Sequence, residues 1–137
     1  MGDRRVDGFF YGLFMDEDVL KQSGVEAQNP RRGYAEGFAL RIGNRATLLP
    51  SENARAYGMI LSMTHRDLET LYSAPGLEVY RPEALLIRTT EGESVPALCY
   101  NLLEAPALGE ANAEYAVRLR DALERRGFPS EYIATVE

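Results

Sequence analysis

The sequence predicts a single α+β domain over residues 1–137, in which about six strands form a small mixed β-barrel with flanking helices. Several stretches alternate apolar and polar residues with the period of a half-buried strand. Residues 110–126 instead have the helical period, with one stripe formed by Ala111, Tyr115, Leu119, Ala122 and Leu123. At 137 residues and 45% hydrophobic, the chain is long enough for one core, and no repeat or linker divides it.

The N-terminal elements are predicted to be a strand, a short helix and a longer strand. The glycine-bounded residues 7–13 form the first strand. Residues 16–22 begin with acidic side chains, which the helix dipole favours in a first turn, and Gly24 follows as a stop signal. Residues 32–42 alternate strictly, which predicts the second strand.

A hairpin and a further strand are expected next. Gly43-Asn44 is a favourable hairpin turn, and the returning strand covers residues 46–49, where Pro50 ends it. After a loop at residues 51–53, another strand is expected over residues 55–63. These segments bring the expected number of strands to four by residue 63.

The C-terminal half is predicted to contain two helices, a hairpin and a final helical turn. Thr64 and Asp67 form a capping pair for a short helix that directs Leu68 and Leu71 inward. The last two strands cover residues 79–89 and 95–103. The helix over residues 110–126 ends at Gly127, and a last helical turn starts at Pro129.

Composition excludes several partners and sites. The net charge of −6 argues against nucleic acid or an anionic membrane surface as a partner. No apolar run approaches the roughly 20 residues of a membrane span, and residues 1–5 lack a signal peptide's apolar stretch. We therefore expect a soluble, cytoplasmic protein, either a monomer or a weak homodimer. Cys99 is the only cysteine, which predicts a buried, inert thiol and no internal disulfide.

The most informative segment is Phe9-Phe10-Tyr11-Gly12-Leu13-Phe14-Met15. An aromatic strand that breaks at glycine presents its last peptide N–H groups to a ligand and so forms an anion-binding corner. This segment resembles the opening strand and loop of the γ-glutamylcyclotransferase family, also called AIG2-like. Four further segments resemble that family in the same order: residues 37–48, 57–63, 98–102 and 123–132.

The resemblance implies a γ-glutamylcyclotransferase-like barrel and a particular reaction. In that reaction the α-amine of a γ-glutamyl compound attacks its own γ-carbonyl, which releases an amine and forms 5-oxoproline. The Tyr-Gly loop holds the substrate's carboxylate end, and a glutamate carries the proton between the two nitrogens. No cofactor is implied. Tyr11, Gly12, Leu13, Phe14, Tyr80 and Tyr100 match the loop and hairpin positions expected to bind the substrate, although the tyrosines fit a buried core equally well.

The chain departs from the family pattern at the position of the proton carrier. In Leu71-Tyr72-Ser73-Ala74-Pro75-Gly76, Tyr72 replaces an aspartate and Pro75 replaces the catalytic glutamate. Proline has no proton to transfer. Leu13 and Phe14 also make the loop less polar than in the family. The sequence therefore predicts a divergent member that binds an amino-acid-like or γ-glutamyl-type molecule without turnover.

Other acids and the single histidine offer alternatives. Glu78 follows the missing glutamate most closely and is the first candidate for a relocated catalytic carboxylate; Glu69 and Glu36 are weaker candidates. His65 has no second histidine or Ser-Asp pair beside it, which argues against a hydrolase or a histidine metal site. The acids of residues 16–18 fit a helix first turn better than a metal site, so no metal is expected.

Three hypotheses follow for the function. The protein binds a small molecule at the Tyr11-Gly12 loop without turnover, or it is an active cyclotransferase that uses Glu78, or it is an interaction protein whose pocket is filled by its own side chains. An open pocket favours the first two. A carboxylate beside the loop with a raised pKa favours the second, and a pocket plugged by Phe14, Leu13 and Tyr80 favours the third.

Overall fold

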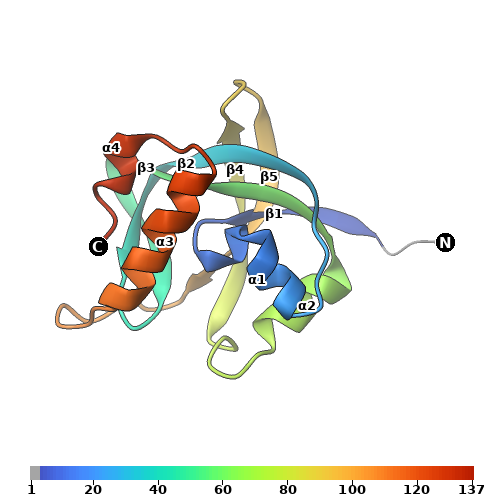
Figure 1. Cartoon of the computed structure of the whole chain (residues 1–137), viewed down its shortest axis with the longest axis horizontal. Helices are drawn as coiled ribbons and strands as arrows, with labels where there is room; N and C mark the ends of the chain where they lie inside the picture. Colours follow the sequence, from blue (N-terminus) through green and yellow to red (C-terminus); the bar gives the residue numbers. More distant parts are fainter. Residues whose placement is uncertain (1–3) are drawn as a thin grey trace.

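The protein is an α+β barrel in the computed structural model, which describes residues 4–137 (Figure 1). Five strands close in the order β1-β3-β2-β4-β5. The pairing is antiparallel except between β1 and β5, so the barrel is mixed, as predicted. The strands are β1 (Arg5–Phe10), β2 (Gln28–Ile42), β3 (Ala46–Thr64), β4 (Tyr80–Thr89) and β5 (Ser94–Leu102). The helical elements are η1 (Leu13–Met15), α1 (Glu17–Gln22), α2 (His65–Tyr72), α3 (Ala113–Arg125) and α4 (Ser130–Ile133).

The barrel has five strands rather than about six because β3 continues through the segment expected to be a loop. Pro50 does not end the strand; it lies opposite Phe38, and the next pair is Glu36 with Arg55. Residues 51–54 of β3 therefore lie opposite Gly37 alone, in a wide irregularity where Gly37 has a φ of +83°. Such a bulge tolerates a proline, because the missing N–H interrupts a ladder that is already broken there.

The first strand is also shorter than expected. β1 ends at Phe10, and the chain turns at Gly12 into the 3₁₀ turn η1 instead of continuing as a strand to Leu13. Asp16 then caps α1 through a hydrogen bond of 2.9 Å that its carboxylate accepts from the Asp18 N–H. The turn places residues 11–15 across the end of the barrel.

The predicted start of α2 and the predicted stop of α3 are confirmed. The Thr64 hydroxyl accepts a 3.0 Å hydrogen bond from the Asp67 N–H, and Leu68 and Leu71 are buried. Gly127 has a φ of +75°, which is the left-handed conformation that ends a helix in this way. The Phe128 N–H reaches back to the Leu123 carbonyl at 3.2 Å.

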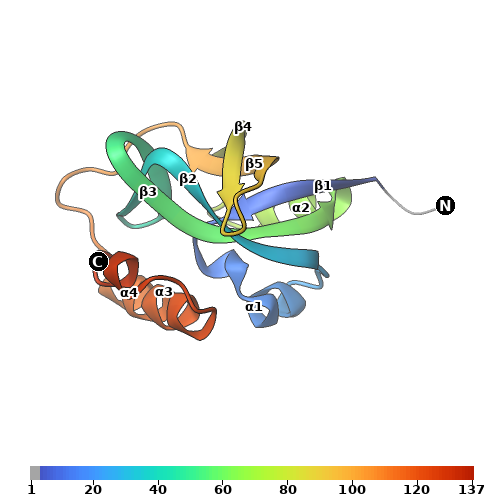
Figure 2. The same ribbon diagram turned by 90° about the horizontal axis from the view of Figure 1, so that it is seen from above.

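Helix α3 packs its apolar stripe on its own chain. Ala116, Leu119, Ala122 and Leu123 are buried, and Figure 2 shows α1, α3 and α4 along one side of the barrel. The helix begins later than predicted, because the Asn112 side chain caps it by accepting a 3.1 Å hydrogen bond from the Tyr115 N–H. Ala111 therefore lies outside the helix and is exposed.

A buried polar cluster joins β3 to β5, which are not neighbours in the sheet. The Asn101 side-chain oxygen accepts from the Leu48 N–H, and the Thr47 hydroxyl accepts from the Leu102 N–H, each at 3.0 Å. Cys99 is fully buried beside this cluster, and burial raises the pKa of its thiol to about 12. Along residues 4–137, none of the helices has the length and apolar character needed to cross a membrane.

Candidate functional site

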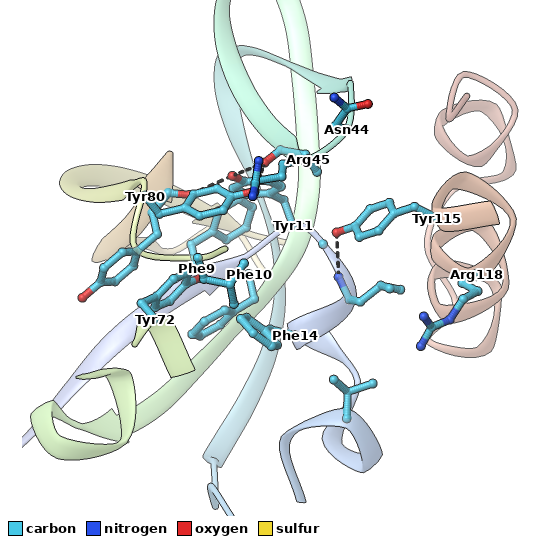
Figure 3. Close-up of a pocket in the computed structure, with 16 residues that line it drawn as sticks. Phe9, Phe10, Tyr11, Phe14, Asn44, Arg45, Tyr72, Tyr80, Tyr115 and Arg118 are labelled. Carbon is cyan, nitrogen blue, oxygen red and sulfur yellow. Dashed lines mark hydrogen bonds between the residues drawn. The ribbon is translucent and has the colours of Figure 1, made fainter. Parts of the chain in front are cut away.

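A cavity of about 370 Å³ lies over the end of β1, where the chain turns at Gly12 (Figure 3). The loop after β1, α2, β4 and β5 contribute aromatic side chains to its wall, and the β2–β3 turn and α3 contribute polar and charged side chains. All six residues that the sequence predicted to bind substrate line this cavity: Tyr11, Gly12, Leu13, Phe14, Tyr80 and Tyr100. The fold therefore brings together positions that are up to 89 residues apart in the chain.

The hydroxyl groups of two wall tyrosines are bound to the barrel backbone. Tyr11 donates to the Tyr100 carbonyl at 2.7 Å, and Tyr80 donates to the Ala46 carbonyl at 2.5 Å. Burial raises the pKa of Tyr11 and of Tyr80 well above the ordinary value for tyrosine. Both side chains are therefore neutral and fixed, and they present ring surface to the cavity.

Tyr72 is the centre of the aromatic wall. Its ring stacks on that of Tyr100, with centroids 3.9 Å apart and an interplanar angle of 8°, and it meets Phe14 edge-on at 5.6 Å. The sequence comparison treated Tyr72 only as the replacement of an aspartate. Its spacing of four from the buried Leu68 on α2 was the available signal that it faces inward.

Tyr115 of α3 occupies the corner that was expected to bind an anion. The Leu13 N–H donates a 3.2 Å hydrogen bond to the Tyr115 hydroxyl. A Cβ atom on Gly12 would lie 2.3 Å from that hydroxyl oxygen, so only glycine allows this approach. The sequence placed Tyr115 on the apolar stripe of this helix, and its position in the cavity wall was not predicted.

Arg45 and Arg118 are the charged side chains of the cavity wall, within the part of the chain that the structure describes. Arg45 is the last residue of the β2–β3 turn, and its Nε donates to the Gly76 carbonyl at 2.7 Å, which fastens the loop that contains Pro75. Arg118 is exposed one turn after Tyr115 on α3. No carboxylate of residues 4–137 is part of the lining. Neither arginine was predicted, because both depend on contacts between distant elements.

The candidate carboxylates lie elsewhere. Glu78 is exposed and is not among the residues that line the cavity, as is also true of Pro75. Glu69 is exposed on α2, and its charge adds to the effect of burial in raising the pKa of Tyr100. Glu36 is exposed and pairs with Arg55 at 3.4 Å. A catalytic role for Glu78 stays a hypothesis that solution experiments have to test.

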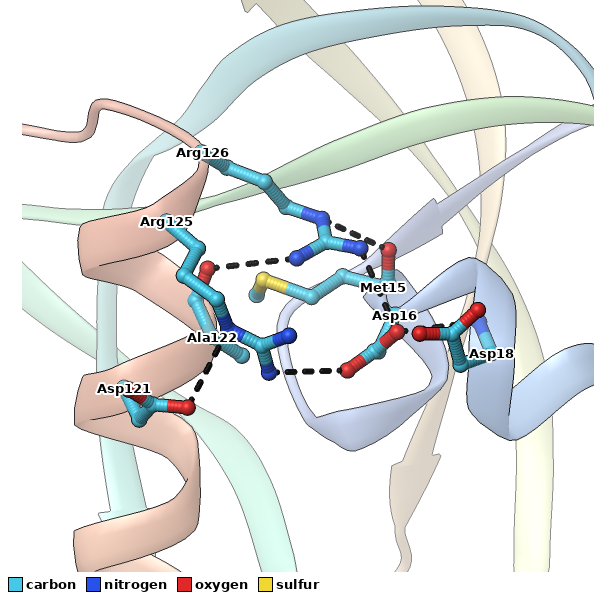
Figure 4. Close-up of polar contacts among 7 residues, drawn as sticks. All are labelled: Met15, Asp16, Asp18, Asp121, Ala122, Arg125 and Arg126. Atoms are coloured by element: carbon cyan, nitrogen blue, oxygen red, sulfur yellow. Dashed lines mark hydrogen bonds and ion pairs between the residues drawn. The ribbon is translucent and has the colours of Figure 1, made fainter.

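Asp16, at the start of α1, belongs to an ion-pair cluster with a structural role. Asp16 is buried, and its carboxylate oxygens lie 3.1 Å from Arg125 and 3.4 Å from Arg126 (Figure 4). Arg126 also donates to the Met15 carbonyl at 3.1 Å. Although burial acts to raise it, the Asp18 N–H and the two guanidinium groups hold the pKa of Asp16 below its usual value. This ion-pair cluster fastens the cavity loop to the C-terminal end of α3.

Comparison with known structures identifies the fold. A γ-glutamyl cyclotransferase superposes with a TM-score of 0.79 over 98% of this chain and 89% of its own, at 17% identity. A γ-glutamyl cyclotransferase from yeast that is specific to glutathione gives 0.67 over 98% and 94%, at 13% identity. An AIG2-like protein from mouse gives 0.57 over 81% and 90%, at 23% identity. No protein-family model and no curated protein sequence matches the chain.

The class of structure is thereby established: the chain has the γ-glutamylcyclotransferase-like fold. The resemblance stated from the sequence is confirmed at the level of this fold, including its α+β class and its closed barrel.

Proposed function

We propose that this protein is a divergent γ-glutamylcyclotransferase-like protein that binds a small amino-acid-like or γ-glutamyl-type acid in the cavity at Gly12 and does not convert it to 5-oxoproline. The observation that carries the proposal is the composition of the cavity wall. Tyrosines and two arginines line it, while no carboxylate of residues 4–137 does so. Guanidinium groups bind carboxylates, which a γ-glutamyl compound offers.

The absence of turnover follows from the proton transfer that the reaction needs. Ring closure takes a proton from the attacking ammonium and gives one to the leaving nitrogen. Arginine does not release a proton at physiological pH. Burial raises the pKa of Tyr11, Tyr72 and Tyr115, so these phenols stay protonated and do not accept a proton from the ammonium group. With Pro75 in the loop and Glu78 outside the lining, the described wall offers no efficient proton carrier.

The cavity volume favours a binding protein over one whose pocket is filled by its own side chains. Tyr115 closes one corner, yet about 370 Å³ remains, which lies within the usual range for sites that bind small molecules. Leu13, Phe14 and Tyr80 form parts of the wall and leave this space open.

The test combines binding and turnover. Calorimetric titration and thermal-shift assays with glutamate, 5-oxoproline and a panel of γ-glutamyl dipeptides and amides should show saturable binding by at least one of these compounds. Arg45→Gln should weaken that binding about tenfold or more, because a charge-assisted hydrogen bond is lost. Arg88→Gln is the matched control, since Arg88 is exposed on β4 and lies outside the cavity lining.

The same panel tests the alternative enzyme hypothesis. Incubation with each γ-glutamyl compound should yield no 5-oxoproline above the uncatalysed background. If 5-oxoproline forms and Glu78→Gln abolishes it, the active-enzyme hypothesis replaces the proposal. If no compound binds and none is converted, the cavity is not a site for γ-glutamyl-type ligands.

A further inference from the structure

The charge of the cavity wall is opposite to that of the chain. The protein carries a net charge of −6, yet the two formal charges on the described cavity wall are both positive. Other arginines at helix α3 have an acidic or a carbonyl partner. Arg125 and Arg126, for example, both pair with Asp16. A cationic wall on an acidic protein is typical of a site for an anionic ligand.

Neither cavity arginine is neutralised by an ion pair with a carboxylate of residues 4–137. Arg45 uses its Nε for the Gly76 carbonyl, and its charge acts on the half-buried Glu110 without forming an ion pair. Glu110 itself accepts from the Asn44 and Ala107 N–H groups. Arg118 makes no hydrogen bond or ion pair with another described residue; its charge acts on Tyr115, where it partly offsets the effect of burial on the phenol's pKa.

The two guanidinium groups are placed to bind separate groups rather than one. Arg45 comes from the β2–β3 turn and Arg118 from α3, and in the view of Figure 3 the Tyr115 hydroxyl lies between them. That hydroxyl already accepts the Leu13 N–H, so this amide is not available to a ligand while the bond is intact. Binding of the ligand's acid groups therefore depends more on the two arginines than on the N–H groups of the loop backbone.

The space next to the arginines is apolar. Phe14 and Val19 line the cavity near α1, and Leu77 lines it on the loop that Arg45 fastens. A hydrocarbon group is stabilised when it leaves water for an apolar surface, so this part of the wall favours an apolar side chain on the ligand.

We propose that Arg118 binds a second acid group of the ligand and so sets a preference for γ-glutamyl dipeptides with an apolar second residue, in which that carboxylate and the apolar side chain are bonded to the same carbon atom. This inference rests on the proposed function and specifies its ligand. It distinguishes γ-glutamyl dipeptides, which carry two carboxylates, from γ-glutamyl amines, which carry one.

The experiment uses a pair of ligands that differ by one carboxylate: γ-glutamyl-leucine and γ-glutamyl-isopentylamide. Calorimetric titration of the full chain should give a dissociation constant at least about tenfold lower for the dipeptide, because a charge-assisted contact is gained. Arg118→Gln should bring the two dissociation constants to within about threefold of each other. Arg88→Gln should preserve the preference, since Arg88 lies outside the lining. Circular dichroism and melting temperature verify that both variants are folded.

Each of the other outcomes overturns the two-acid proposal. Equal affinities in the unmodified protein, or a tenfold preference that survives Arg118→Gln, overturn the two-acid proposal while the proposed function stands. If the unmodified protein binds neither compound, the two-acid proposal falls, and the wider ligand panel decides whether the proposed function stands.

Discussion

Helix α3 meets the segment after β1 at two places, and the two contacts differ in how charge is balanced. At its C-terminal end, Arg125 and Arg126 enclose the buried Asp16 carboxylate (Figure 4). Two turns or more toward its N-terminus, Tyr115 and Arg118 face the cavity, where no described carboxylate lines the wall (Figure 3). One helix thus has a neutralised contact that holds the loop and an unbalanced contact at the cavity, where we propose that an anionic ligand binds.

The difference separates residues that position the loop from residues that we propose bind the ligand. The Asp16 cluster and the Tyr115–Leu13 hydrogen bond fix residues 12–16 on both sides of η1. Substitutions in the Asp16 cluster should therefore change stability, whereas substitutions at Arg118 should change binding with little effect on stability. The following predictions test this distinction, beginning with the largest expected effect.

Asp16→Ala should be the most destabilising change. It removes the cap of α1 and leaves the guanidinium of the largely buried Arg126 without its acid, which together should cost about 2–4 kcal/mol of unfolding free energy. Urea denaturation measures the loss. Asp121→Ala, which removes only an exposed partner of Arg125, is the matched control and should cost less than about 0.5 kcal/mol.

The pH dependence of the unfolding free energy should also depend on Asp16. Because the folded-state pKa of Asp16 is lowered, its contribution to stability is complete above the unfolded-state pKa of about 4 and is lost as pH falls through the folded-state value. The unmodified protein should therefore lose more stability than Asp16→Ala does when pH falls below about 4. Equal slopes for the two proteins would show that the ion pairs contribute nothing.

Gly12→Ala should have the next largest effect. Its Cβ would lie 2.3 Å from the Tyr115 hydroxyl oxygen but 3.6 Å from the ring carbon that bears it. We expect a loss of about 1–3 kcal/mol, as for other overpacked sites. The double variant Gly12→Ala/Tyr115→Phe should recover most of this loss, since it removes the clashing atom. Gly109→Ala, where a Cβ meets nothing within 4 Å, is the control.

Much of the fold is predictable from local sequence signals. The Gly43-Asn44 turn, the Thr64 cap and the Gly127 stop each depend on side chains within a few residues of one another, and each is confirmed. Pro50 was misinterpreted because a bulge, which depends on pairing with β2, accommodates it. Whether a proline ends a strand at such a position depends on pairing with a distant strand, and the local sequence pattern carries no information about that pairing.

The candidate site is predictable only in part for the same reason. Tyr11, Gly12, Tyr80 and Tyr100 could be found because they match sequence motifs on single strands. Tyr115 and Arg118 reach the cavity through the packing of α3 against the barrel, and Arg45 reaches it from the β2–β3 turn, which contacts the loop at Gly76. No local pattern encodes these contacts. The helical period indicated that Tyr115 faces inward but could not distinguish a core position from a cavity wall.

Tyr115→Phe should have the smallest effect on stability. It deletes the hydroxyl that accepts the Leu13 N–H and should cost about 0.5–1.5 kcal/mol, the usual net value of one hydrogen bond. It also frees that amide for a ligand, so binding of γ-glutamyl-leucine should not weaken. A tenfold loss of affinity in calorimetric titration would instead show that the Tyr115 hydroxyl contacts the ligand.

The most direct measurement is a nitrogen-15 NMR titration of the full chain with γ-glutamyl-leucine, which follows backbone amides and arginine Nε–H groups together. The account predicts saturable shifts at the Gly12 and Leu13 amides and at the Nε–H of Arg45 and Arg118, with the ligand recovered intact. Shifts confined to other surfaces, or conversion of the ligand to 5-oxoproline, would contradict it.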